Sequence, residues 1–291
     1  MKRKEFLKKL SISSLSLMGA PLLLKGEETR MEKDKSNLNI VGFNHLPNKE
    51  IKTMKSVIHK ANTRGHANHG WLNSYHSFSF ANYYNPERMN FGVLRVLNDD
   101  QVSAGKGFGT HPHSNMEIIS IPLSGDLEHK DSMGNTTIIK EGDIQVMSAG
   151  TGIQHSEFNK NLDQEVRFLQ IWVIPNKQNV TPRYDQIPLK DVEIENEFYQ
   201  ILSPNENDKG VWIHQDAWFN IGDFKKETST SYKLNNTNNG VYAFVLEGEL
   251  SINGQNLEKR DGFGVWEESE LKIETKSNTK VLLMEVPLEN K

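Results

Sequence analysis

Apolar and polar residues alternate along short segments of the chain, and turns rich in glycine, asparagine and proline separate these segments. Such alternation is typical of half-buried strands. In the first half it predicts strands over residues 91–97, 116–123, 127–133, 136–139 and 167–174. The first of these is expected to stop at residues 98–100. In the second half it predicts strands over residues 211–214, 218–221, 241–246, 249–252 and 281–286.

No long helical pattern occurs after the first 24 residues, so we expect an all-β protein in which two barrels pack together. The segment 175–188 contains three prolines and no periodic apolar pattern, and it is therefore predicted to be a linker. We expect one barrel domain over residues 38–180, where the part before residue 60 is an extension lying on the barrel. A second, shorter barrel domain is expected over residues 181–291.

The first 37 residues have the layout of an export leader followed by a polar linker. Residues 1–9 carry five basic residues and one acid, and residues 10–24 form an uncharged apolar run. That run is shorter than the roughly 20 residues that span a bilayer. Arg3-Lys4 resembles the start of a twin-arginine signal with lysine as its second residue. We expect export to the periplasm, with membrane contact only through an uncleaved leader; a cytoplasmic protein is the alternative.

Composition narrows the range of partners. The chain has 34 Lys and Arg against 38 Asp and Glu, a net charge of −4, so we expect no nucleic-acid partner. It has no cysteine, which excludes disulfides, thiolate metal sites and a cysteine nucleophile. We expect a monomer.

Two pairs of candidate ligands have the same internal spacing. His111 and His113 form one pair, His155 and Glu157 form the other, and glycines precede both. Residues i and i+2 of a strand project from the same face, so two such pairs on neighbouring strands can surround one ion. A single His-x-His is more often a surface feature. The conjunction of two pairs predicts a site for one divalent transition metal.

These blocks also carry a family resemblance. Residues 105–117 and 142–157 resemble the two cupin motifs, and the sequences Gly-Thr-His-Pro-His and Ala-Gly-Thr-Gly-Ile-Gln-His-Ser-Glu within them resemble the pirin family. Residues 70–86 and 170–184 resemble the bacterial quercetinase-type branch of that family. The resemblance runs from Asn62 to the C-terminus. It implies two jelly-roll (cupin) barrels in tandem, with the metal in the first. The second half does not repeat the ligand pairs, so we expect the second barrel to be metal-free.

Carried over residue by residue, the resemblance implies His111, His113, His155 and Glu157 as metal ligands. Glu117 is the alternative, because most metal-binding cupins take their carboxylate from the first block. Ser148 stands where proline is usual, which alters a turn and leaves the ligand set intact. The expected metal is iron(II), with manganese, cobalt, nickel, copper and zinc as alternatives.

The resemblance further implies a quercetin 2,3-dioxygenase type of reaction. The partners would be a small phenolic substrate and O2, with Glu157 as both ligand and catalytic base. One alternative is a pirin-type binding or regulatory module that has no turnover. Another is a structural metal with closed coordination.

The remaining histidines and one acid are given structural roles. His45, His59 and His129 are predicted to be exposed. His66, His69 and His76 belong to a polar, aromatic segment that is expected to pack across a sheet. Asp143 is expected to fix a turn, and the second half shows no histidine pair, since His214 stands alone.

Overall fold

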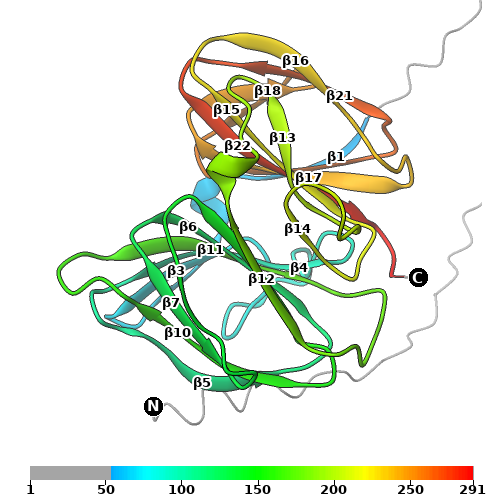
Figure 1. Ribbon diagram of the computed structural model, residues 1–291. Helices are drawn as coiled ribbons and strands as arrows, with labels where there is room; N and C mark the ends of the chain where they lie inside the picture. Colours follow the sequence, from blue (N-terminus) through cyan, green and yellow to red (C-terminus); the bar gives the residue numbers. More distant parts are fainter. Residues whose placement is uncertain (1–53, 291) are drawn as a thin grey trace, which may run out of the picture. The chain divides into compact units, whose positions relative to one another are not determined.

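The computed structural model describes residues 54–290 (Figure 1). The predicted leader and linker over residues 1–37 lie outside the described residues, as does His45. Strands and turns make up nearly all of the described chain, with short 3-10 helices at Ala61–Thr63 and Leu189–Asp191. Over the described range, no helix is long and apolar enough to cross a membrane.

The first barrel consists of two antiparallel sheets. Its larger sheet has the order β12-β9-β6-β11-β4-β3-β2, and its smaller sheet has the order β5-β10-β7-β8. The strands of the larger sheet are β2 (Gly65–Asn68), β3 (Leu72–His76), β4 (Leu94–Val102), β6 (Glu117–Ser124), β9 (Asp143–Ser148), β11 (Val166–Val173) and β12 (Arg183–Pro188). Those of the smaller sheet are β5 (Gly107–His113), β7 (Leu127–Asp131), β8 (Thr136–Ile139) and β10 (Ile153–Asn159).

The second barrel repeats this arrangement. Its sheets have the orders β1-β20-β17-β22-β15-β13-β14 and β16-β21-β18-β19, which correspond to those of the first barrel, except that the edge strand β14 pairs parallel with β13. The larger sheet contains β1 (Lys55–His59), β13 (Phe198–Ser203), β14 (Val211–Trp212), β15 (Trp218–Phe224), β17 (Asn239–Glu247), β20 (Gly262–Trp266) and β22 (Thr279–Pro287). The smaller sheet contains β16 (Thr228–Lys233), β18 (Glu249–Ile252), β19 (Gln255–Glu258) and β21 (Glu270–Thr275). The expected all-β fold of two tandem barrels is confirmed.

The two barrels exchange one strand each. β1 precedes the first barrel in the chain yet pairs with β20 of the second, and β12 follows residue 180 yet pairs with β9 of the first. The prediction that residues 175–188 are only a linker was therefore wrong for Arg183–Pro188. Pro188 is tolerated because β12 is an edge strand and the proline is its last residue. The predicted domain division at residue 180 stays a prediction, and strand pairing crosses it twice.

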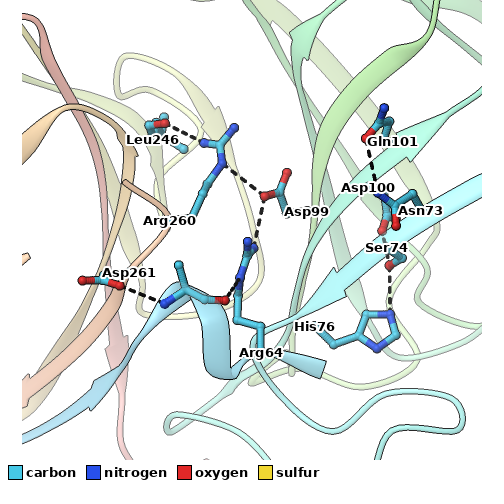
Figure 2. A network of polar contacts seen from close by, with 11 residues as sticks. Arg64, Asn73, Ser74, His76, Asp99, Asp100, Gln101, Leu246, Arg260 and Asp261 are labelled. Atoms are coloured by element: carbon cyan, nitrogen blue, oxygen red, sulfur yellow. Dashed lines mark hydrogen bonds and ion pairs between the residues drawn. The ribbon is translucent and has the colours of Figure 1, made fainter. Parts of the chain in front are cut away.

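β4 continues through the acidic residues that were expected to end it. Asp99 lies between two guanidinium groups, at 3.1 Å from Arg64 and 3.1 Å from Arg260, and Asp100 accepts a hydrogen bond from Ser74 (Figure 2). Because each carboxyl group has a polar partner, burial in the strand does not leave it without hydrogen bonds. The polar tripeptide therefore stays in the sheet.

Buried apolar residues form one large cluster between the larger sheets of the two barrels, and smaller clusters inside the first barrel. The largest core cluster joins residues of β4, β6 and β11 to residues of β15, β17 and β22, so the two larger sheets share one core. The interior of the first barrel holds two smaller apolar clusters, one around Phe168 and one around Met147. Polar side chains of the same strands share this interior, and the candidate site is formed from them.

His59 corrects a second prediction. It was expected at the surface, but its exposed fraction is 5% and its Nδ1 lies 2.9 Å from the hydroxyl of Tyr242. Its position follows from β1, which pairs with the second barrel and places His59 against that barrel's larger sheet.

Candidate metal centre

Three histidines meet inside the first barrel. His111 and His113 come from β5, His155 comes from β10, and the antiparallel pairing of the two strands places His155 opposite His111. The ring centroids are 4.5 Å apart for His111 and His155, 4.9 Å for His111 and His113, and 5.0 Å for His113 and His155. One ring nitrogen of each lies within 4.8 Å of the others.

Gly107 allows the close approach of these two strands. A Cβ at this position would lie 2.2 Å from the carbonyl oxygen of Glu157 and 2.5 Å from Cα of Phe158. The register of β10 against β5 also shifts between His155 and Glu157, where two residues of β10 span three of β5. Both features arise from the glycine-containing block that precedes His111.

The nitrogen atoms of the cluster suit a metal ion. His111 Nδ1 is 2.8 Å from the carbonyl oxygen of Gly109, which can only accept, so the proton is on Nδ1 and Nε2 is left as a donor atom for a metal. His113 Nε2 and both ring nitrogens of His155 are buried without a hydrogen-bond partner among the described residues. Buried polar atoms are rarely left in this way, and a ligand is one explanation for them.

The electrostatics of the three rings agree with that fit. Burial lowers the pKa of each, to about 3 for His113 and still further for His155. All three imidazoles are therefore neutral at pH 7, which is the form that ligates a metal. The residues present thus fit a divalent transition metal.

Glu157 lies beside His155 and is buried. One of its carboxylate oxygens accepts a hydrogen bond from Ser120 at 3.1 Å. The amide of Gln170, turned so that its nitrogen faces the carboxylate, donates to both oxygens at 3.0 and 3.2 Å. Burial raises the pKa of Glu157 to about 7, and nearby Asp100 adds to the rise. Glu157 is within 4.8 Å of His155 and His129, and its role as the fourth ligand stays a prediction.

His129 was predicted to be exposed, and that prediction was wrong. Its exposed fraction is 0%, and it lies directly opposite Glu157 in the pairing of β7 with β10. Its sequence neighbours, Glu128 and Lys130, are charged and form salt bridges at the surface. Residues of a strand alternate between faces, so charged neighbours on both sides indicate an inward-facing residue. That alternation was the available signal.

Glu117 has a different environment from Glu157. It accepts a hydrogen bond from Ser148 at 2.6 Å and another from the backbone of His214, and burial raises its pKa to about 7. It belongs to neither of the ligand clusters found in residues 54–290. The serine that replaces the usual proline therefore has a structural partner in Glu117.

An aromatic surface borders the histidine cluster. The ring centroid of Trp172 lies 4.9 Å from that of His113 and 5.5 Å from that of Phe80, in edge-to-face arrangements. Trp172 also packs against a buried apolar cluster that includes Ile118 and Met147. The imidazole groups thus lie next to aromatic and apolar side chains, a combination that is common where small organic molecules bind.

The other sequence-selected residues lie outside the cluster. His66 stacks on Tyr75 at 4.6 Å, and His76 Nε2 lies 2.8 Å from the hydroxyl of Ser74 (Figure 2). Asp143 accepts a hydrogen bond from the backbone of Lys140 across a turn, as expected. In the second barrel, Tyr232 of β16 fills the corresponding interior and donates to the buried Glu285 at 2.8 Å.

Comparison with known proteins agrees with this geometry. The Pirin family model matches residues 57–173, and the model of the quercetinase C-terminal cupin domain matches residues 200–286. The quercetin 2,3-dioxygenase of Escherichia coli K12 is 43% identical over 230 residues, covering 79% of this chain and 98% of that protein. A putative quercetin 2,3-dioxygenase of Pseudomonas aeruginosa is 44% identical over 223 residues, covering 76% and 95%.

A solved structure extends the comparison to three dimensions. The bacterial pirin YhhW of Escherichia coli, in complex with nickel(II), superimposes with a TM-score of 0.76 at 41% identity, over 80% of this chain and 99% of that one. The two family matches, the identity to whole relatives and the double-barrel fold lead to one conclusion. This chain belongs to the pirin family.

Proposed function

We propose that this protein is a metal-dependent dioxygenase of the quercetin 2,3-dioxygenase type, which cleaves a flavonol or a similar phenolic with O2. The observation that carries the proposal is the cluster of His111, His113 and His155. Within residues 54–290, His113 Nε2 and both ring nitrogens of His155 are buried without a hydrogen-bond partner. The identity to relatives named quercetin 2,3-dioxygenase supports the reaction class.

We infer that His111, His113, His155 and Glu157 hold one divalent transition metal. When bound, the metal would act as a Lewis acid that lowers the pKa of a phenolic hydroxyl group. Three neutral imidazoles and one carboxylate suit iron, nickel, copper or zinc. The nickel(II) complex of the related pirin supports a metal of this class. We keep iron(II) as the expected native metal, and metal analysis of the purified protein tests that choice.

Glu157 is the group that we assign as base. In the metal-free protein, burial raises the pKa of Glu157 to about 7, so this carboxylate binds a proton more readily than an exposed glutamate does. Ser120 and Gln170 hold the carboxylate by hydrogen bonds, which limits its rotation. Trp172 and Phe80 offer aromatic faces against which the rings of a flavonol can pack.

Oxygen uptake tests this function. The metal-free chain is reconstituted anaerobically with iron(II), mixed with quercetin and exposed to O2. Uptake and loss of the flavonol absorbance should follow metal content and fall at least about 100-fold in His111→Ala. His66→Ala, an exposed histidine on β2, is the control and should keep the wild-type rate. One bound metal per chain with neither uptake nor a spectral change would favour a binding module instead.

We also propose that residues 1–24 direct export of the folded, metal-loaded protein. The basic start and the apolar run of the sequence support this proposal. Cell fractionation tests it: the protein should occur in the periplasm, and Arg3→Gln with Lys4→Gln should retain it in the cytoplasm. A cytoplasmic wild-type protein would contradict it.

A further inference from the structure

His155 has a histidine neighbour on each side. Its strand, β10, lies between β5 and β7 in the smaller sheet. The ring centroid of His155 is therefore 4.5 Å from that of His111 on one side and 5.4 Å from that of His129 on the other. Both ring nitrogens of His155 are buried and lack a partner within the described part of the chain. A neutral imidazole offers one lone pair and one N–H. If the lone pair binds a metal, the N–H still needs an acceptor.

The tautomer of His129 makes it a candidate for that acceptor. Its Nε2 lies 3.2 Å from Oδ2 of Asp131, and a carboxylate only accepts, so the proton of neutral His129 is on Nε2. Its Nδ1 is therefore a lone pair, and this atom is buried and without a partner among residues 54–290.

Asp131 is itself fixed in place. Its side chain is fully buried, and it accepts hydrogen bonds from the backbone of Met133 at 2.9 Å and from the backbone and amide of Asn135 at 3.1 and 2.8 Å. The tight turn between β7 and β8 thus holds the carboxylate, and the carboxylate sets the tautomer of His129. The turn therefore orients His129, which lies next to His155 of the three-histidine cluster.

We propose that Asp131 and His129 form an outer pair that positions His155 and sets the metal affinity of the site. In this arrangement Nδ1 of His129 accepts the N–H of His155 that the metal leaves free. A hydrogen bond of about 3 Å between two ring nitrogens brings the ring centroids to about 5 Å, close to the separation found. Metal-bound histidines usually donate their second N–H in this way. The inference rests on the metal centre proposed above.

A second cation position is the competing explanation. His129, His155 and Glu157 offer ligand atoms within 4.8 Å of one another. For an ion there and another at the three-histidine cluster, His155 would have to bind both and so lose its remaining proton. A neutral imidazole has a single lone pair, which favours the positioning role.

Cobalt(II) binding to the full-length, metal-free chain tests the inference. Affinity is measured by calorimetry, and the ligand geometry is followed by the visible absorption of the bound cobalt. In His129→Leu the affinity should fall about 10–100-fold and the absorption should change. In His129→Asn, where the amide oxygen can accept near the position of Nδ1, the affinity should return to within about threefold of wild type. His59→Leu, which removes a buried histidine from β1 in the larger sheet of the second barrel, is the matched control.

The outcomes are distinguishable. Both His129→Leu and His59→Leu remove a buried ring, so both can lower the stability of the fold. Thermal melting of the metal-free variants measures this loss of stability separately from the loss of metal affinity. Wild-type affinity and absorption in His129→Leu would overturn the inference. Two cobalt ions per wild-type chain and one in His129→Leu would also overturn it, in favour of His129 as a ligand. A wild-type chain that takes up no cobalt would overturn the proposed metal centre as well.

Discussion

Glu157 and Glu117 are both buried glutamates of the first barrel, and burial raises the pKa of both to about 7. Their neighbours differ. Glu157 lies beside His155, whereas Glu117 accepts hydrogen bonds from Ser148 and from the backbone of His214. A raised pKa therefore does not by itself separate a catalytic acid from a structural one, and the contacts of each group are needed to assign its role.

Exchange of the two glutamates for glutamine tests this assignment. Glu157→Gln should lower oxygen uptake by about 100-fold or more, because an amide cannot accept the phenolic proton. Glu117→Gln should lower the free energy of unfolding yet keep the wild-type rate per metal-loaded chain. Steady-state uptake with quercetin, normalised to bound metal, measures both. Equal losses in the two variants would contradict the assignment.

His59 should make folding sensitive to acid. Burial lowers its pKa from about 6.5 to about 4 in the folded protein, so the unfolded chain takes up the proton first as the pH falls. The stabilisation is complete above pH 6.5 and is lost between pH 6.5 and 4, by up to about 3 kcal/mol. Urea unfolding of wild type and His59→Asn across this range should show a smaller decline in the variant. Parallel curves would show that His59 does not contribute.

At the scale of the element, alternation predicted five of the eleven strands of the first barrel, namely β4, β6, β7, β8 and β11, and it predicted the i, i+2 ligand pairs. It missed the pairing partners. β12 ends in a proline and follows two other prolines in the sequence, so its residues do not resemble a strand. β1 pairs with a strand some 200 residues away, and nothing in its own residues indicates to which sheet it belongs. β16 and β21 were missed because their polar outer faces leave few apolar residues.

Residue spacing along the strands predicted part of the candidate site, but it did not reveal every residue of that site. Spacing alone paired His111 with His113, and strand geometry then brought His155 beside them. His129 was missed because it was judged by its charged neighbours rather than by the face on which it lies. Its relation to Asp131 depends on the turn after β7, which spacing does not reveal.

Alanine substitutions at two glycines of the β5 region distinguish the effect of a steric clash from that of backbone strain. Gly107→Ala would place a Cβ 2.2 Å from a carbonyl of β10, so β5 must move away and metal affinity should fall along with about 1–3 kcal/mol of stability. Gly105→Ala meets no atom within 4 Å but has a φ of +62°, so it should cost about 1 kcal/mol with unchanged metal affinity. Chemical unfolding and cobalt(II) titration measure the two effects. Equal affinities would contradict this account of β5.

At the scale of the described chain, the two barrels are joined by three features. They share the core between their larger sheets, they exchange β1 and β12, and Asp99 of the first barrel pairs with Arg260 of the second. Arg64 binds the same carboxylate, and its guanidinium lies over the rings of Tyr75 and Phe244. Unfolding of one barrel should therefore expose part of the other, and we expect a single cooperative transition.

Asp99→Ala tests the ionic part of this junction. It would leave Arg64 and Arg260, whose side chains are only 7% and 15% exposed, without their shared carboxylate. The free energy of unfolding should fall by about 3 kcal/mol. Asp163→Ala, at an exposed position, should change it by less than about 0.5 kcal/mol. Urea denaturation gives both values, and similar values for the two variants would exclude a stabilising role for the junction.

The proposed cleavage of a flavonol by O2 at the three-histidine cluster is tested most directly by its products. The iron(II)-loaded protein is given quercetin under ¹⁸O₂, and carbon monoxide and the labelled product are quantified. We expect the wild-type protein to consume one O2 and release one carbon monoxide per quercetin, with both oxygen atoms of O2 in the ring-opened product. We expect no such turnover in His111→Ala. Hydrogen peroxide in place of carbon monoxide, or equal turnover in the variant, would contradict it.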